Sequence, residues 1–127
     1  MGTRFMMSRE CPLHPNIKEW LLQATEKDTL MIMRSINNPE RVAKTGFARS
    51  VLQMEEKGTS LEELLPMVSG LRQKQALDRG DIYQAMVPCG QVIGLIHEIP
   101  SVKEIIQGII SDAKLIGQRF HNIGLTE

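Results

Sequence analysis

The last third of the chain carries the clearest pattern of apolar and polar positions. Ser101 and Glu104 have the spacing of a capping box, in which the two side chains satisfy free amides at the start of a helix. The apolar residues that share one stripe after this box are Val102, Ile105, Ile106, Ile109, Ile110, Ala113, Ile116 and Phe120. A long amphipathic helix over 102–120 is therefore predicted, and its apolar face must lie on another surface.

Two helices are predicted in the first half of the chain. Apolar residues at positions i, i+3, i+4 and i+7 predict the first, over 15–24. Asn38 suits an N-cap and Pro39 suits the first helical position, which predicts that a second helix starts there. This helix is weakened at Gly46 and is expected to resume as far as Lys57.

Two shorter helices are predicted in the middle of the chain. Ser60 and Glu63 form a second capping box, and the helix that follows is expected to end at Gly70. The next stretch, 71–79, has a helical pattern and stops at Gly80, a residue type common at helix C-termini.

Strand signals are few and short. The run 29–33 is continuously apolar and short enough for a buried strand, and 3–7 is predicted to finish a strand. The stretch 91–96 is apolar on nearly all sides, which indicates burial. The predicted fold class is mainly α, with one or two short strands.

Composition limits the classes of function. The 127 residues suffice for one domain, and basic and acidic residues balance at 15 each. Nine of each precede the cut at Leu64 and six of each follow it, so neither half has the basic excess that binding to a nucleic-acid backbone requires. No stretch reaches the roughly 18 apolar residues of a membrane span. A cytoplasmic protein without nucleic-acid or membrane partners is expected.

The histidines and cysteines of the sequence give little support to a metal site or a reactive thiol. His14, His97 and His121 do not pair at ligand spacing, so no metal site is expected. Cys11 and Cys89 form no C-x-x-C pair and suit reduced thiols, although a disulfide between them is possible in principle. A small residue buried in a tight turn explains Cys89 better than a reactive thiol does.

Two short segments suit an anionic ligand. Gly2 and Thr3 combine a backbone that an anion can approach closely with a neighbouring hydroxyl. Gly90 and Gln91 stand at the start of an apolar helical stretch, where free amides and a carboxamide could meet a ligand. The alternatives remain open: an ordinary chain start in the first case, and close packing at glycines in the second.

Taken together, these segments resemble the C-terminal part of the FMN-dependent nitronate monooxygenases, formerly called 2-nitropropane dioxygenases. The similarity covers nearly the whole chain in the family's order and spacing. The matching pieces are 1–5, 10–15, 31–35, 38–43, 64–70, 80–81, 89–96 and 99–101.

The resemblance implies the C-terminal part of a TIM-like α/β barrel with an inserted helical domain. On that pattern, 1–11 ends a late barrel strand and the loop after it, 12–84 forms the inserted substrate domain, and 85–127 returns to the barrel and its outer helix. Because a complete barrel needs about 250 residues, the resemblance further implies a fragment of a larger enzyme or a truncated gene product.

The implied function is oxidation of alkyl nitronates with FMN and oxygen. Gly2 and Thr3 would close the FMN phosphate site, and Gly90 and Gln91 would also bind the cofactor. No histidine here matches the family's catalytic position, so no catalytic residue is assigned, and the chain alone is expected to be inactive. The alternative is a small helical protein-interaction module without catalysis, which uses the stripe over 102–120 as its partner surface. In the family this face covers barrel strands, so the isolated chain is expected to self-associate through it or to be poorly ordered at both ends.

Overall fold

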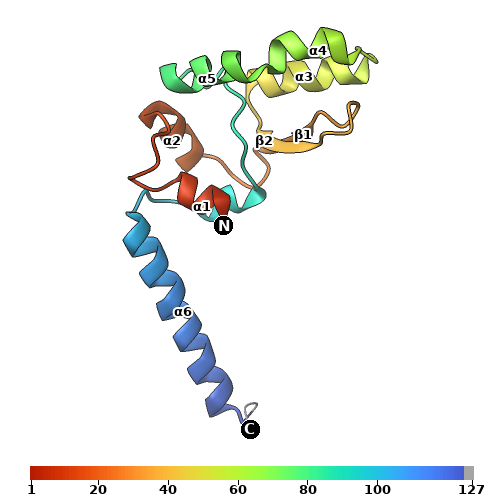
Figure 1. The fold of residues 1–127 in the computed structure, drawn as a ribbon. Coiled ribbons are helices and arrows are strands. Elements are labelled where there is room, and N and C mark those ends of the chain that lie inside the picture. The colour runs from red at the N-terminus through yellow and green to blue at the C-terminus, as the bar shows by residue number, and fades with distance from the viewer. Residues whose placement is uncertain (125–127) are drawn as a thin grey trace.

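The computed structural model describes residues 1–124 and is mainly helical, with a single two-stranded sheet in that part of the chain (Figure 1). The elements in chain order are α1 (Gly2–Met6), α2 (Pro15–Leu22), β1 (Thr29–Ile32), β2 (Glu40–Ala43), α3 (Gly46–Glu56), α4 (Leu61–Val68), α5 (Gly70–Arg79), the 3-10 helix η1 (Gln91–Leu95) and α6 (Val102–Asn122). The predicted fold class, mainly α with one or two short strands, is confirmed.

The sheet is a hairpin whose second strand the sequence did not predict. β1 and β2 pair antiparallel, with Thr29 opposite Ala43 and Ile32 opposite Glu40. The helix expected to start at Pro39 is wrong in this region, because 40–43 is extended. Pairing with β1 and a bridge from Val42 to Pro88 satisfy this backbone, and such tertiary pairing outweighs a local capping signal.

The first residues are helical, which corrects a second expectation. The amide of Phe5 donates to the carbonyl of Met1, and the amide of Met7 donates to the carbonyl of Thr3, as in a helical turn. The expectation that 3–7 finishes a strand is therefore wrong, because within the described residues this segment has no neighbouring strand to pair with. The division at 11 and 84 stays a prediction.

The remaining helices follow their sequence signals. Ser60 and Ser101 accept hydrogen bonds from the N3 amides, and both capping boxes are complete. α3 starts at Gly46 rather than at Pro39, with Thr45 as its N-cap. Glycines with positive φ follow the ends of α3 and α5, at Gly58 and Gly80, as expected of helix C-termini.

The buried side chains form two clusters that meet at β2. One lies around α1, α2 and η1 and includes Ile17, Leu21 and Ile93; the other lies between the hairpin, α3 and α4. Successive residues of β2 pack in different clusters: Val42 belongs to the second cluster and Ala43 to the first. The short hairpin therefore joins the two halves of the core.

The stretch 91–96 is only partly buried, contrary to its apolar sequence. Ile93 and Ile96 are buried, whereas Leu95 is 79% exposed. The physical reason is the 3-10 helix, whose three residues per turn direct side chains at neighbouring positions to different sides.

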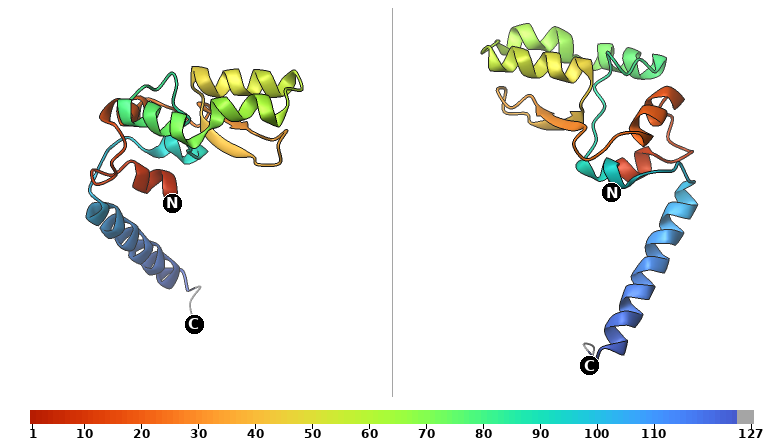
Figure 2. Two further views of the ribbon diagram at one scale, coloured as in Figure 1. Left: turned by 45° about the horizontal axis from the view of Figure 1, so that its top comes forward. Right: turned by 180° about the vertical axis from the view of Figure 1, so that it is seen from behind.

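Helix α6 leaves the rest of the molecule after its first turn (Figures 1 and 2). That turn is well anchored: both carboxylate oxygens of Glu10 accept from the amide of Val102, and Arg9 pairs with Glu104 at 3.1 Å. Beyond Ile105, which is buried, the described side chains of α6 are exposed. Among the described residues, no helix combines the length and apolarity needed to cross a membrane.

Glu55 is expected to make the free energy of unfolding depend on pH in the acidic range. Its carboxylate accepts hydrogen bonds from the amides of Met33 and Ser35 and from the Ser35 hydroxyl. Burial raises the pKa of Glu55, but these hydrogen bonds outweigh that effect and leave the pKa below its usual value. The stabilisation is present above the unfolded-state pKa and is lost as the pH falls through the lower folded-state pKa.

The variant Glu55→Gln should lower the free energy of unfolding by about 1 kcal/mol at pH 7. Denaturant titrations at pH 7 and at pH 3 would measure the difference from wild type, which should shrink in acid. Glu56→Gln, next in α3 and exposed, is the matched control and should change little. A Glu55→Gln effect that is equal at both pH values would contradict this account.

Candidate functional site

Two of the four residues that the sequence singles out for cofactor binding are in contact. The backbone N–H of Gly90 donates a 3.0 Å hydrogen bond to Oγ1 of Thr3, and the two residues are 87 positions apart. Thr3 lies in the first turn of α1, and Gly90 is the N-cap of η1. The beginnings of these two short helices are therefore held side by side, and we call this contact the Thr3–Gly90 junction.

The other two predicted residues, Gly2 and Gln91, flank the junction on the solvent side. Both are exposed, and each is the first residue of its helix. A Cβ placed on Gly2 would meet no heavy atom within 4 Å. The backbone beside Thr3 is thus open to an approaching ligand and not closed by this chain's own side chains.

The donor groups at the junction suit a phosphate. The first amides of a helix have no partner inside that helix, which applies to Gly2 and Gln91. The Thr3 hydroxyl accepts from Gly90 and keeps its own proton to donate, and the Gln91 carboxamide adds two N–H donors. This set of neutral donors around an open backbone fits the phosphate group of FMN that the resemblance implies.

Two of the other candidate residues, His14 and Cys89, have structural roles. Nδ1 of His14 accepts from the amide of Asn16 at the start of α2. Cys89 is buried, and burial raises the pKa of its thiol to about 11 despite the nearby charge of Arg41. The thiol is therefore protonated at neutral pH, which agrees with its interpretation as a small buried residue. Within residues 1–124, no group of three or more His, Cys, Asp or Glu side chains could hold a metal.

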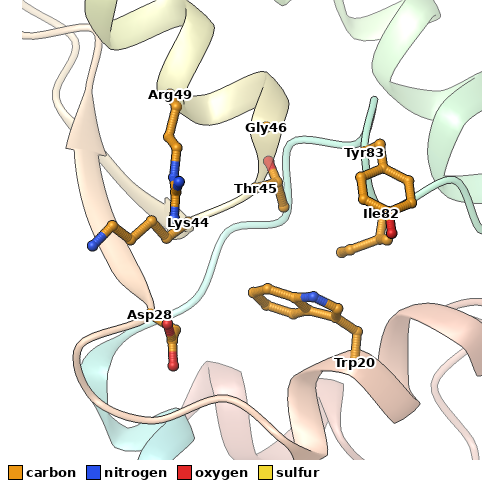
Figure 3. A pocket seen from close by; sticks show the side chains of 8 residues that line it. All are labelled: Trp20, Asp28, Lys44, Thr45, Gly46, Arg49, Ile82 and Tyr83. Carbon is orange, nitrogen blue, oxygen red and sulfur yellow. The ribbon is translucent and has the colours of Figure 1, made fainter.

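A separate cavity of about 330 Å³ lies between α2, the N-terminal end of α3 and the segment after α5 (Figure 3). Trp20, Ile82 and Tyr83 form its apolar end, and Asp28, Lys44 and Arg49 lie at the other. Thr45 and Gly46 connect the two ends. We call this cavity the Trp20 pocket.

The charged side chains of the Trp20 pocket are two cations and one anion. Hydrogen bonds from the amide and hydroxyl of Thr25 hold the pKa of Asp28 below its usual value, and the charges of Lys44 and Arg49 act in the same direction. Asp28 is therefore ionised at neutral pH, and the pocket carries two cations and one anion. Neither cation forms an ion pair within 4.0 Å among the residues that the structure describes.

Sequence reasoning missed the Trp20 pocket because its residues come from four separate segments. The available signals were weak: a single tryptophan in the chain, and Lys44 and Arg49 flanking a predicted weak point in a helix. Nothing local connects these positions to Tyr83, which lies 34 residues after Arg49 in the numbering.

A comparison with protein families identifies the family of this chain. Residues 1–112 match the family model described as nitronate monooxygenase. The chain belongs to the nitronate monooxygenase family. Enzymes of this family, FabK among them, are FMN-dependent oxidoreductases, so the suggested resemblance is confirmed at the level of a flavin oxidoreductase family.

Similar proteins cover different named activities. A FabK structure from Thermotoga maritima superposes with a TM-score of 0.86 at 33% identity, over 97% of this chain and 39% of that one. The chain is 24% identical to a protein of Rhodococcus jostii and 26% identical to one of Mycobacterium tuberculosis, over 89% of its length in both cases. Both carry the name (3aS,4S,5R,7aS)-5-hydroxy-7a-methyl-1-oxo-octahydro-1H-indene-4-carboxyl-CoA dehydrogenase.

This chain spans about two fifths of each of these relatives, 39% of FabK and 42% of the two dehydrogenases. The similarity to FabK, a TIM-barrel enzyme, therefore concerns part of that fold. The named activities differ among these relatives, so family membership leaves the reaction and the substrate of this chain open.

Proposed function

We propose that this protein takes part in the oxidation of alkyl nitronates with FMN and oxygen, as a segment that helps to hold the cofactor. The Thr3–Gly90 junction carries the proposal, because it joins two distant segments that the family resemblance assigns to cofactor binding. FMN, when bound, supplies the redox chemistry. The family match over residues 1–112 supports the flavin oxidoreductase part.

The residues of this chain would bind and orient the cofactor. The open backbone at Gly2, the Thr3 hydroxyl and the amide side chain of Gln91 would donate hydrogen bonds to the phosphate. Gly90 would hold Thr3 in place through its 3.0 Å hydrogen bond. The histidine that the resemblance makes catalytic has no match among His14, His97 and His121, so proton transfer is assigned to no residue of this chain.

A hybrid enzyme tests the substrate. This chain would replace the 39% of Thermotoga maritima FabK that it matches, and oxygen uptake would be followed with propyl nitronate. The hybrid should exceed both free FMN and parental FabK, and the 127-residue chain with added FMN should not exceed free FMN. A hybrid that holds FMN but leaves the nitronate untouched would disprove the substrate and leave the cofactor site standing.

A second candidate function, a helical interaction module, is supported by one specific observation. Five large apolar side chains on the predicted stripe of α6 are between 44% and 50% exposed: Ile106, Ile109, Ile110, Ile116 and Phe120. A continuous exposed apolar surface of this kind is typical of a contact with another protein surface. The two functions are compatible, since a cofactor-holding segment can also associate through α6.

A further inference from the structure

The Trp20 pocket has aromatic side chains at one end and cationic side chains at the other. Its apolar end has two aromatic side chains on different segments: Trp20 on α2, half-buried, and Tyr83 after α5, which is 76% exposed. Figure 3 shows the indole of Trp20 lying below the side chain of Ile82, and the ring of Tyr83 lying above it. Aromatic side chains that line one cavity offer a planar ligand group a surface to stack on.

The opposite end of the pocket suits an anion. Lys44 and Arg49 lie on the side away from Tyr83 (Figure 3) and have no ion-pair partner within 4.0 Å among the described residues. Asp28 lies at the same end, and its Oδ2 accepts both hydrogen bonds from Thr25, each of 2.8 Å. The two cations outnumber this one anion, and both guanidinium and ammonium groups bind phosphate well.

We propose that the Trp20 pocket binds a nucleoside monophosphate, with the base against Trp20 and Tyr83 and the phosphate on Lys44 and Arg49. The volume of about 330 Å³ falls at the lower end of the range for small-molecule sites. A base and a phosphate on one ribose match the two ends of the pocket. The site shares no residue with the Thr3–Gly90 junction, so an experiment can test it independently of the proposed function.

Trp20 provides a direct readout, because it is the sole tryptophan of the chain. Titration of the 127-residue chain with AMP should change its fluorescence in a saturable way. Adenosine and inorganic phosphate, each offering one half of the ligand, should bind at least about tenfold more weakly, since a charge-assisted hydrogen bond or a stacked base is then missing. Added KCl should weaken AMP binding through screening of the exposed cations.

Two exposed cations supply the variants, and a third supplies the control. Lys44→Gln and Arg49→Gln should each raise the dissociation constant for AMP about tenfold. Lys57→Gln, at the far end of α3, should leave it unchanged, and circular dichroism would show that all three fold alike. Saturable binding that survives both pocket substitutions, equal affinity for inorganic phosphate alone, or no saturable change with AMP would each overturn the proposal.

Discussion

Replacing Gly80 with alanine should lower the free energy of unfolding by about 3 kcal/mol, from two separate effects. Gly80 ends α5 with a φ of +67°, a left-handed conformation that disfavours any side chain. An added Cβ would also lie 2.1 Å from Nδ1 of His14. That nitrogen accepts the capping hydrogen bond from Asn16, so the substitution disturbs the end of α5 and the start of α2 together. Chemical denaturation would measure the loss.

A matched glycine separates the two effects. Gly58 has a similar φ of +75°, but a Cβ there would meet no heavy atom within 4 Å. Gly58→Ala should therefore cost only the conformational part, about 1 kcal/mol. Combining Gly80→Ala with His14→Ala should show a coupling energy, because the clash disappears with the ring. If Gly80→Ala costs no more than Gly58→Ala, the described packing of Gly80 on His14 is wrong.

The second large effect concerns assembly. We propose that the chain self-associates through α6, with a second copy covering its apolar stripe. Burying one Ile side chain contributes about 1.5–3 kcal/mol, and five large apolar residues of the stripe are exposed. Zero net charge adds no repulsion.

Sedimentation at several concentrations should reveal the association. The double variant Ile109→Lys with Ile116→Lys should shift the species toward monomer by at least about tenfold in dissociation constant, because burying unpaired charges in the contact is costly. Gln107→Lys with Ser111→Lys adds the same charge on the other face of α6 and should leave association intact. A wild-type chain that stays monomeric at every concentration would contradict the proposal.

Signals within one turn of chain predicted most helices correctly. The capping boxes at Ser60 and Ser101 and the glycines after α3 and α5 define helix ends through side chains only a few residues away. β2 was missed because its partners are β1 and the segment at Pro88, neither of which is visible in a local window. Asn38 and Pro39 favour the start of a helix, but strand pairing outweighed that local preference here.

The candidate site shows the same limit at longer range. The residue types at Gly2, Thr3, Gly90 and Gln91 suggested anion binding at two places, and only the family resemblance connected them. The contact between Thr3 and Gly90, across 87 positions, appears only in the folded chain. The Trp20 pocket left no comparable trace, because its aromatic and basic side chains lie on three separate segments that share no sequence pattern.

The FMN content of the FabK hybrid tests most directly whether the Thr3–Gly90 junction belongs to a cofactor site. Gly2→Val fills the open backbone beside Thr3, and Gly70→Val is its control, because both glycines begin a helix and a Cβ at either meets nothing within 4 Å. The account predicts that the hybrid and its Gly70→Val form purify with about one FMN per chain, whereas Gly2→Val loses most of it. Equal FMN content in the two valine variants, both folded, would contradict the assignment.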